Sequence, residues 1–243
     1  MDTTPDQSDS TRQGWQRGLT QVLPIVLGYI PIGFAYGVLA QEAGLSPRNT
    51  VLMSLLVYAG ASQFIATGLF ASGMSPLSIV LTTLVTNLRH LLMSASLAPH
   101  VRHWRKPLLA AFAYQVTDET FAVHAARFVS APALAPVGKA EVFCVNLVAQ
   151  AAWVFGGWLG IAGGQVIPDP RPWGLDYALS AMFIALLVLQ IKNRIQVGVA
   201  LLAGGLAVGL ALLGLDQWAV VVSTIVGATI GVLWERWIKT PSP

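Results

Sequence analysis

The chain has 243 residues, and only 10% of them are charged, with 14 Lys and Arg against 11 Asp and Glu. An average soluble domain carries about 25% charged residues. Hydrophobic residues make up 55% and the mean hydropathy is +0.65, so a soluble fold could not avoid large exposed apolar patches. The composition excludes an ordinary soluble enzyme, a disordered chain and a nucleic-acid-binding protein. It predicts an all-α, polytopic integral membrane bundle.

The ends of the chain and its single cysteine set further bounds. Residues 1–17 are polar and rich in Ser, Thr and Asp, so we expect a disordered N-terminal tail before one membrane domain over residues 18–238. The net charge of +3 is expected to anchor loops at the anionic cytoplasmic face. Cys144 stands alone, which excludes an internal disulfide and a multi-thiolate metal cluster.

Uncharged runs mark the expected membrane segments, because a bilayer core needs about 20 apolar residues in a helix. Segment two is dense in small and polar residues, and segment six has only about 15 residues, a rise of about 23 Å. Both are predicted to be broken or re-entrant helices that line a polar cavity. The seven or eight segments are 18–41, 50–71, 77–98, 108–129, 142–168, 176–191, 195–215 and 217–234.

Two further patterns concern the arrangement of the segments. Segments one and two echo segments five and six weakly, which indicates either an internal repeat or a chance likeness of apolar stretches. The basic residues of the tail and of the loop 100–107 both favour a cytoplasmic position. They fall on opposite sides if segments one to three all cross. A re-entrant segment two is one arrangement that reconciles them.

Polar groups at membrane depth are costly and usually face the bundle interior. In segment one, Pro31 frees a backbone carbonyl and Gly33 allows close approach, so this stretch either lines a site or packs tightly on another helix. In segment two the polar groups either line a site or bond between helices. The candidate residues there are Tyr58, Gly60, Ser62 and Gln63.

The next two polar clusters carry charge. Arg89 is either a snorkelling cation or an internal one that pairs with Asp118 or Glu119 or binds a substrate carboxylate. The two adjacent carboxylates lie in the middle of segment four, and they either bind a cation or proton or form a structural ion pair. The candidates in these clusters are Asn87, Arg89, His90, Thr117, Asp118 and Glu119.

Other chemistry receives little support. The sequence has no phosphate-binding loop, and its histidines lack metal-ligand spacing, so neither a cofactor nor a metal is expected. The run from Gly60 to Gln63 fits the Gly-x-Ser-x pattern of rhomboid-type intramembrane proteases, which also need a histidine base. The residues at depth also fit a non-transporting membrane scaffold, in which they only bind a partner bundle.

The polar clusters, in this order, resemble those of the AzlC family of bacterial inner-membrane proteins over about residues 14–238. In this family pattern an Ala often stands where this chain has Ser62. The matching stretches are Leu23-Pro24 through Pro31-Ile32-Gly33-Phe34-Ala35-Tyr36-Gly37, then Gly60-Ala61-Ser62-Gln63-Phe64, Asn87-Leu88-Arg89-His90 and Thr117-Asp118-Glu119.

The resemblance implies a multi-pass inner-membrane subunit of a secondary-active exporter for valine, leucine, isoleucine or other apolar amino acids, coupled to an ion or a proton. It also implies a small AzlD-type membrane partner. Arg89 is then the candidate for the substrate carboxylate or for holding Asp118, and Asp118 or Glu119 the candidate for the ammonium or the proton. A homo-oligomer stays open, and no nucleic acid is expected.

Overall fold

The computed structural model describes residues 7–130, 137–164 and 193–239, with scattered positions between 166 and 191. Two compact units divide the chain, Met1–Leu179 and Ser180–Pro243. The predicted all-α membrane fold is confirmed. Among the described helices, four are long and apolar enough to cross a bilayer, and they lie within α1, α4, α7 and α9.

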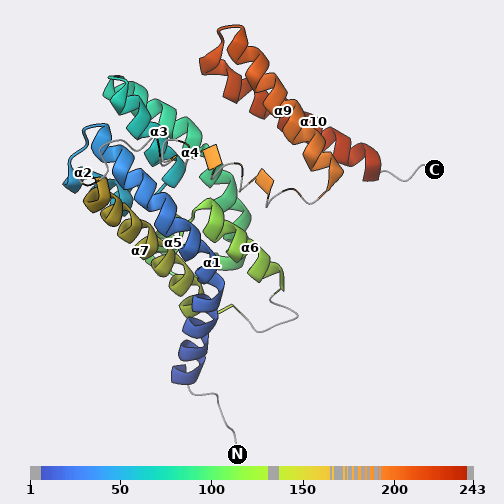
Figure 1. Cartoon of the computed structure of the whole chain (residues 1–243). Coiled ribbons are helices and arrows are strands. Elements are labelled where there is room, and N and C mark those ends of the chain that lie inside the picture. Colours follow the sequence, from blue (N-terminus) through green and yellow to red (C-terminus); the bar gives the residue numbers. More distant parts are fainter. Residues whose placement is uncertain are drawn as a thin grey trace, which may run out of the picture. The chain divides into compact units, whose positions relative to one another are not determined.

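Two long helices, α1 (Gln7–Glu42) and α7 (Lys139–Gly164), form a parallel pair (Figure 1). Near their starts, a Cβ on Gly14 would lie 3.1 Å from the Ala140 Cβ, and near their ends one on Gly37 would lie 2.2 Å from the Gly157 carbonyl oxygen. The backbones therefore touch, as small residues permit in membranes. We call the end at which both helices begin end A, and the other end B.

Helix α1 differs from expectation in two respects. It begins at Gln7, so residues 7–17 are helical, where the sequence predicted a disordered tail; residues 1–6 lie outside the described part of the chain. It also continues through Pro24 and Pro31. Pro31 is exposed on its outer side.

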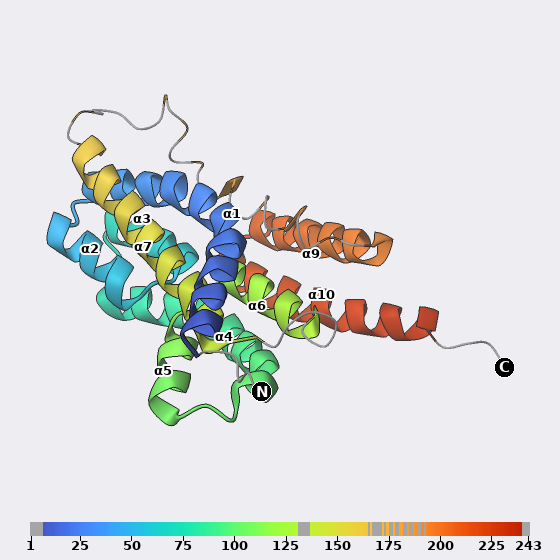
Figure 2. The same cartoon turned by 90° about the horizontal axis from the view of Figure 1, so that it is seen from below.

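Helices α2 (Pro47–Leu56) and α3 (Gly60–Ala71) form a helical hairpin that enters the bundle from end B (Figure 2). Ser46 caps α2 ahead of a proline, and Gln41 of α1 donates to Thr50 at the start of α2 (3.2 Å). The tip of the hairpin, residues 57–59, reaches the middle of α7, where Gln150 donates to the Leu55 carbonyl (3.3 Å). The predicted break in segment two is therefore present.

Helix α4 (Pro76–Val101) runs back from end B to end A. Ser75 caps it ahead of a proline, as Ser46 caps α2. At its far end the His100 ring stacks on Phe128 (4.8 Å between centroids), and in the loop that follows the Trp104 ring stacks on Phe143 in the second turn of α7 (5.9 Å).

The next segment differs from the single helix expected over 108–129. It is a second hairpin, made of α5 (Lys106–Tyr114) and α6 (Asp118–Ser130) and entering from end A. The chain turns at residues 115–117, and α6 then returns to end A, where Arg127 in its last turn meets Glu141 in the first turn of α7. The polar groups that the sequence placed in mid-helix therefore lie at a helix N-terminus.

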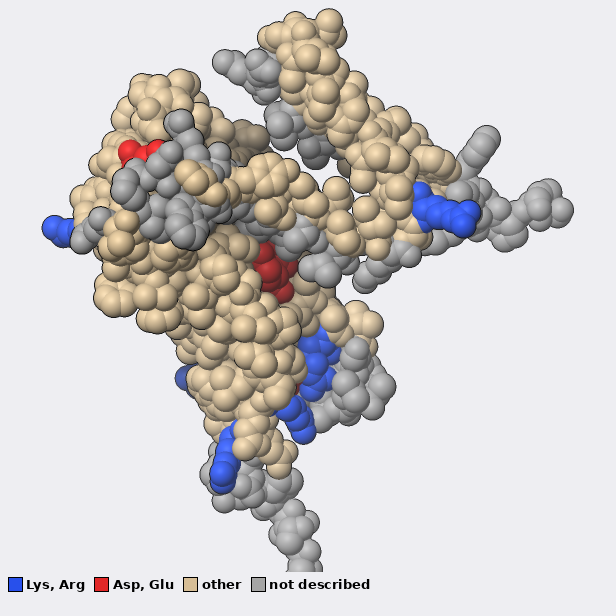
Figure 3. All heavy atoms as spheres, in the orientation of Figure 1, with Lys and Arg blue, Asp and Glu red and all other residues tan. Residues whose placement is uncertain are grey.

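These elements repeat with inverted direction, since α1 with the α2–α3 hairpin is followed by α4 with the α5–α6 hairpin. The re-entrant arrangement brings both basic clusters to end A, which reconciles their expected cytoplasmic positions. Figure 3 shows Lys and Arg gathered toward that end of the α1–α7 bundle. The exposed Lys and Arg residues there are Arg12, Arg17, Arg102, Arg105, Lys106 and Lys139.

The second unit contains α9 (Arg194–Leu212) and α10 (Asp216–Lys239), which pack as an antiparallel pair. Gly214, with φ +76°, forms the turn between them, a conformation that glycine adopts without strain. These helices match predicted segments seven and eight to within a few residues. Predicted segment six, and with it the proposed echo of segments one and two, lies largely outside the described residues.

Candidate functional site

The two hairpin tips meet near the middle of the bundle. Tyr114 donates to the carbonyl oxygen of Leu55, and Gln150 of α7 donates to both the Leu55 carbonyl (3.3 Å) and the Tyr114 hydroxyl (3.1 Å). Tyr58 at the first tip has φ +45°, a strained value for a residue with a large side chain. Non-helical backbone is tolerated at membrane depth where it is buried in protein or lines a cavity.

Helix α6 starts with a reciprocal cap. The Thr117 amide donates to the Thr120 hydroxyl (2.8 Å), and the Thr120 amide donates to the Thr117 hydroxyl (3.3 Å). Asp118 and Glu119 occupy the first turn, where the helix dipole favours negative charge. The segment breaks here because the two threonines and the two acids together form a strong helix start.

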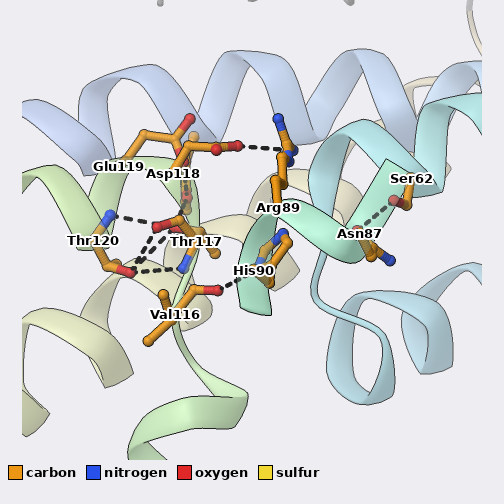
Figure 4. Close-up of polar contacts among 10 residues, drawn as sticks. Ser62, Asn87, Arg89, His90, Val116, Thr117, Asp118, Glu119 and Thr120 are labelled. Carbon is orange, nitrogen blue, oxygen red and sulfur yellow. Dashed lines mark hydrogen bonds and ion pairs between the residues drawn. The ribbon is translucent and has the colours of Figure 1, made fainter. Parts of the chain in front are cut away.

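An ion pair connects α4 to this tip. Arg89 Nη2 lies 2.8 Å from Asp118 Oδ2, and the two side chains are 30% and 15% exposed (Figure 4). The neighbouring His90 ring bonds through Nδ1 to the Val116 carbonyl (3.0 Å), while its Nε2 is buried without a hydrogen-bond partner. The pairing of Arg89 with one of the two acids was one of the predicted alternatives.

Glu119 faces α1 instead. Its Oε2 accepts a hydrogen bond from the Tyr29 hydroxyl (2.6 Å), which also lies 2.7 Å from the Thr117 hydroxyl. The buried Tyr58 hydroxyl lies close to Glu119 and to the Tyr29 hydroxyl, without a hydrogen bond of good geometry to either. The polar groups at the two hairpin tips, which we call the centre, therefore include a buried hydroxyl that a bound solute can satisfy.

Residues of α3 lie on both sides of this centre. Ser62 donates to the Asn87 side-chain oxygen of α4 (2.7 Å). Gln63 is fully buried; it donates to Ser54 (3.2 Å) and accepts from the Trp153 indole (3.0 Å). Gly60 admits the same indole, since a Cβ there would lie 2.9 Å from Trp153 Cη2. Gln63 and Gly60 thus hold α3 against α7.

The structure brings ten of the twelve predicted site residues to the two tips and the facing part of α4. Pro31 and Gly33 are not among them. Pro31 is exposed, and a Cβ on Gly33 would lie 2.9 Å from the Trp153 carbonyl oxygen. The environment of Gly33 is that of close helix packing, the second of the two roles considered for it.

Sequence reasoning missed a second buried polar group near end A. Arg127 Nε lies 2.6 Å from Glu141 Oε1, and Gln21 donates to the same oxygen (2.7 Å). Close by on the same two helices, His124 Nε2 lies 2.7 Å from the Asn146 side-chain oxygen. Arg127 and Glu141 stand at or next to the edges of predicted segments four and five, where a charged residue is expected in any membrane helix. The spacing of His124 and Arg127, three residues apart on one helix face, was the available signal.

An apolar groove of about 490 Å³ lies on the outer face between α2 and α7. Gln150, which bonds to both tips, forms part of its wall. The groove therefore adjoins the tips from the apolar side. Its lining residues are Val51, Leu55, Leu147, Gln150, Ala151, Val154, Phe155 and Trp158.

Comparison with known sequences places this architecture in a family. The pattern that defines the AzlC family, described as AzlC protein, matches residues 24–167, which include the second half of α1, both hairpins, α4 and α7. The chain belongs to the AzlC family. The ten predicted site residues at the hairpin tips and on α4 lie inside the matched range. The buried groups of the second cluster also lie inside it, except Gln21.

Relatives extend the similarity beyond the matched range. The chain is 34% identical over 219 residues to an uncharacterized membrane protein of Archaeoglobus fulgidus, covering 88% of this chain and 92% of the relative. It is 30% identical to the inner membrane protein YgaZ of Escherichia coli (90% and 88% covered). It is 28% identical to the branched-chain amino acid transport protein AzlC of Bacillus subtilis (82% and 76% covered). No solved structure matches the chain.

Proposed function

We propose that this AzlC-family protein is the transport subunit of a secondary-active exporter for branched-chain or other apolar amino acids, coupled to a proton or another ion. The observation that carries the proposal is the Arg89–Asp118 ion pair (2.8 Å) at the point where two opposed hairpin tips meet. Broken helices that meet near the midplane are typical of secondary transporters. The printed name of the Bacillus subtilis relative supports the substrate class.

The two helix N-termini at the centre suit the two charges of an amino acid. Ala59 precedes α3 and supplies no side-chain cap, so the first amides of α3 can hold a carboxylate together with Arg89. Helix α6 is capped by its own threonines, so the groups that it offers to the ammonium are the carboxylates of its first turn, Asp118 and Glu119. In this proposal the substrate separates Arg89 from Asp118 and takes over both partners.

Several wider assignments belong to the same proposal. Residues 18–238 act as one transport domain in the bacterial inner membrane, and a small AzlD-type subunit binds beside it. Whether the chain forms a homo-oligomer is to be measured on the same purified protein. The inner-membrane location is supported by the printed name of the Escherichia coli relative and by the four apolar helices.

The test replaces Asp118 with Asn and measures leucine or valine efflux from loaded cells, at matched amounts of protein. We expect efflux to fall at least about tenfold, because a charge interaction at the binding centre is lost. The matched control is Glu42→Gln, the same chemical change at an exposed position at the end of α1, which is expected to leave efflux unchanged. Unchanged efflux in Asp118→Asn removes this residue from the mechanism.

The alternative functions gain less support. A serine protease needs a histidine base at its nucleophile, whereas the Ser62 hydroxyl donates to the amide oxygen of Asn87. A non-transporting scaffold and an exporter differ in whether the protein moves an amino acid across a liposome membrane. Efflux from vesicles that contain the chain, with and without its small partner, separates the two.

A further inference from the structure

One face of α6 carries polar side chains along its whole length. They recur at intervals of three and four residues, which places them on a single stripe. Thr120 is fully buried, and His124 is 2% exposed. The stripe starts at the central tip and finishes at end A. Its members are Thr117, Thr120, His124 and Arg127.

At the central tip the stripe joins a chain of hydroxyl groups. Glu119 Oε2 lies 2.6 Å from the Tyr29 hydroxyl, which lies 2.7 Å from the Thr117 hydroxyl. The Thr117 hydroxyl in turn lies 3.3 Å from that of Thr120. Each hydroxyl both donates and accepts, so these oxygens form an unbroken hydrogen-bonded path away from the carboxylate.

At end A the stripe joins a buried carboxylate. Glu141 is 2% exposed and is held by Arg127 (2.6 Å) and Gln21 (2.7 Å). It stands in the first turn of α7, where the helix ends of the bundle approach the aqueous phase. His124 lies within electrostatic range of Glu141.

His124 stands between the two ends. Its Nε2 is fixed by Asn146 (2.7 Å), and its ring packs among Phe112 and Phe128. It follows Thr120 by one helical turn, a rise of about 6 Å. In the path proposed below, a water molecule between Thr120 and His124 would complete this step.

We propose that this face of α6 is the path along which the coupling proton moves between end A and Glu119. The inference rests on the proposed function of a proton-coupled transporter. The Asn146 side-chain oxygen holds the Nε2 proton in place, so His124 takes up the coupling proton at Nδ1 and releases it again from the same atom. Each hydroxyl on the way accepts one proton and passes its own along, so Glu119 gains one proton and no hydroxyl changes charge.

The charged and titratable groups that face the path lie around His124 and around Glu119. Around His124 they are Glu141 of α7 and Arg127 of α6. Around Glu119 they are Tyr29, Tyr58 and the neighbouring Asp118. Asp118 is held by Arg89, which leaves Glu119 as the carboxylate that the path reaches.

The experiment uses the full chain, with its small partner if required, in liposomes. It compares leucine exchange, which needs no net proton movement, with uphill leucine accumulation driven by a pH gradient. For His124→Gln we expect exchange within about twofold of wild type and gradient-driven accumulation reduced at least about tenfold, since a relay group is lost. The matched control is His100→Gln, an exposed histidine that stacks on Phe128, for which both rates stay unchanged.

A second pair of variants tests the hydroxyl chain. Thr120→Ser keeps the hydroxyl and is expected to keep coupling, whereas Thr120→Val removes it and is expected to lose coupling. Full gradient-driven accumulation in His124→Gln overturns the path and leaves the exporter proposal intact. Equal loss of exchange and accumulation in His124→Gln also overturns it, because the residue is then structural. A wild-type protein that exchanges no apolar amino acid overturns both proposals.

Discussion

The Tyr114 hydroxyl at the end of α5 donates a hydrogen bond to the carbonyl oxygen of Leu55 at the end of α2. A helix that stops in mid-membrane leaves its last carbonyls without partners. Here the opposite hairpin supplies the donor, and Gln150 supplies another. The two tips therefore satisfy each other, and withdrawal of the α5–α6 hairpin removes the Tyr114 donor from the Leu55 carbonyl.

Tyr114→Phe is expected to loosen this connection. Removing one hydrogen bond to a carbonyl that keeps Gln150 as a second donor should destabilise the protein by about 1 kcal/mol. The measurement is the midpoint of thermal unfolding in detergent. Tyr177→Phe, an exposed tyrosine, serves as the matched control. A midpoint unchanged from wild type would show that the tips are held by other contacts.

The Arg89–Asp118 pair should show strong energetic coupling. Arg89→Gln removes the cation from a largely buried carboxylate, and Asp118→Asn removes the carboxylate charge that faces the guanidinium, so each single change should destabilise the protein by about 1–3 kcal/mol. The double variant Arg89→Gln with Asp118→Asn should be no less stable than either single variant. Thermal unfolding of the four proteins gives the coupling energy; strictly additive effects would speak against a direct interaction.

The close contact of α1 with α7 predicts a steric effect at Gly160. A Cβ there would lie 2.1 Å from the Phe34 carbonyl oxygen, so Gly160→Ala should force the helices apart and destabilise the protein by about 1–3 kcal/mol. Gly28→Ala is the matched control on α1, because nothing lies within 4 Å of its added Cβ. It should be neutral or stabilising by up to about 1 kcal/mol. Equal stability of the two variants would contradict the observed packing.

The re-entrant arrangement predicts the sidedness of three arginines. In a Cys144→Ala background, Arg12→Cys and Arg102→Cys should react with a membrane-impermeant thiol reagent from the cytoplasmic side. Arg48→Cys, at the start of α2, should react from the opposite side. Labelling of positions 12 and 102 from different sides would show that the first hairpin crosses the membrane completely.

The sequence predicted the helical fold and most of the central residues for identifiable reasons. Charged groups in apolar runs pointed to Arg89, Asp118 and Glu119, and the polar density of segment two indicated its break. The second break was missed because 108–129 has the length of an ordinary span. The signal for it was local, a threonine cap followed by two acids at 117–119.

Other features depend on packing that a single sequence does not reveal. Gly33 and Gly60 were each considered for lining a site or for contact between helices, and in the structure each makes room for part of Trp153 on another helix. Glu141 and Arg127 looked like boundary charges, and only the return of α6 to end A brings them together (2.6 Å). Pairings of this kind follow from the hairpin topology and not from local spacing.

The inverted order of the hairpins has a consequence for access. Helix α3 has 12 residues and α6 has 13, so each reaches only about 18–20 Å into the bundle. In the proposed exporter, a solute held between Arg89 and Asp118 is separated from each aqueous phase by one short hairpin. Displacing either hairpin alone would open the centre to one aqueous phase while the other hairpin stays in place. The α1–α7 pair, held in close contact through its glycines, would not need to move.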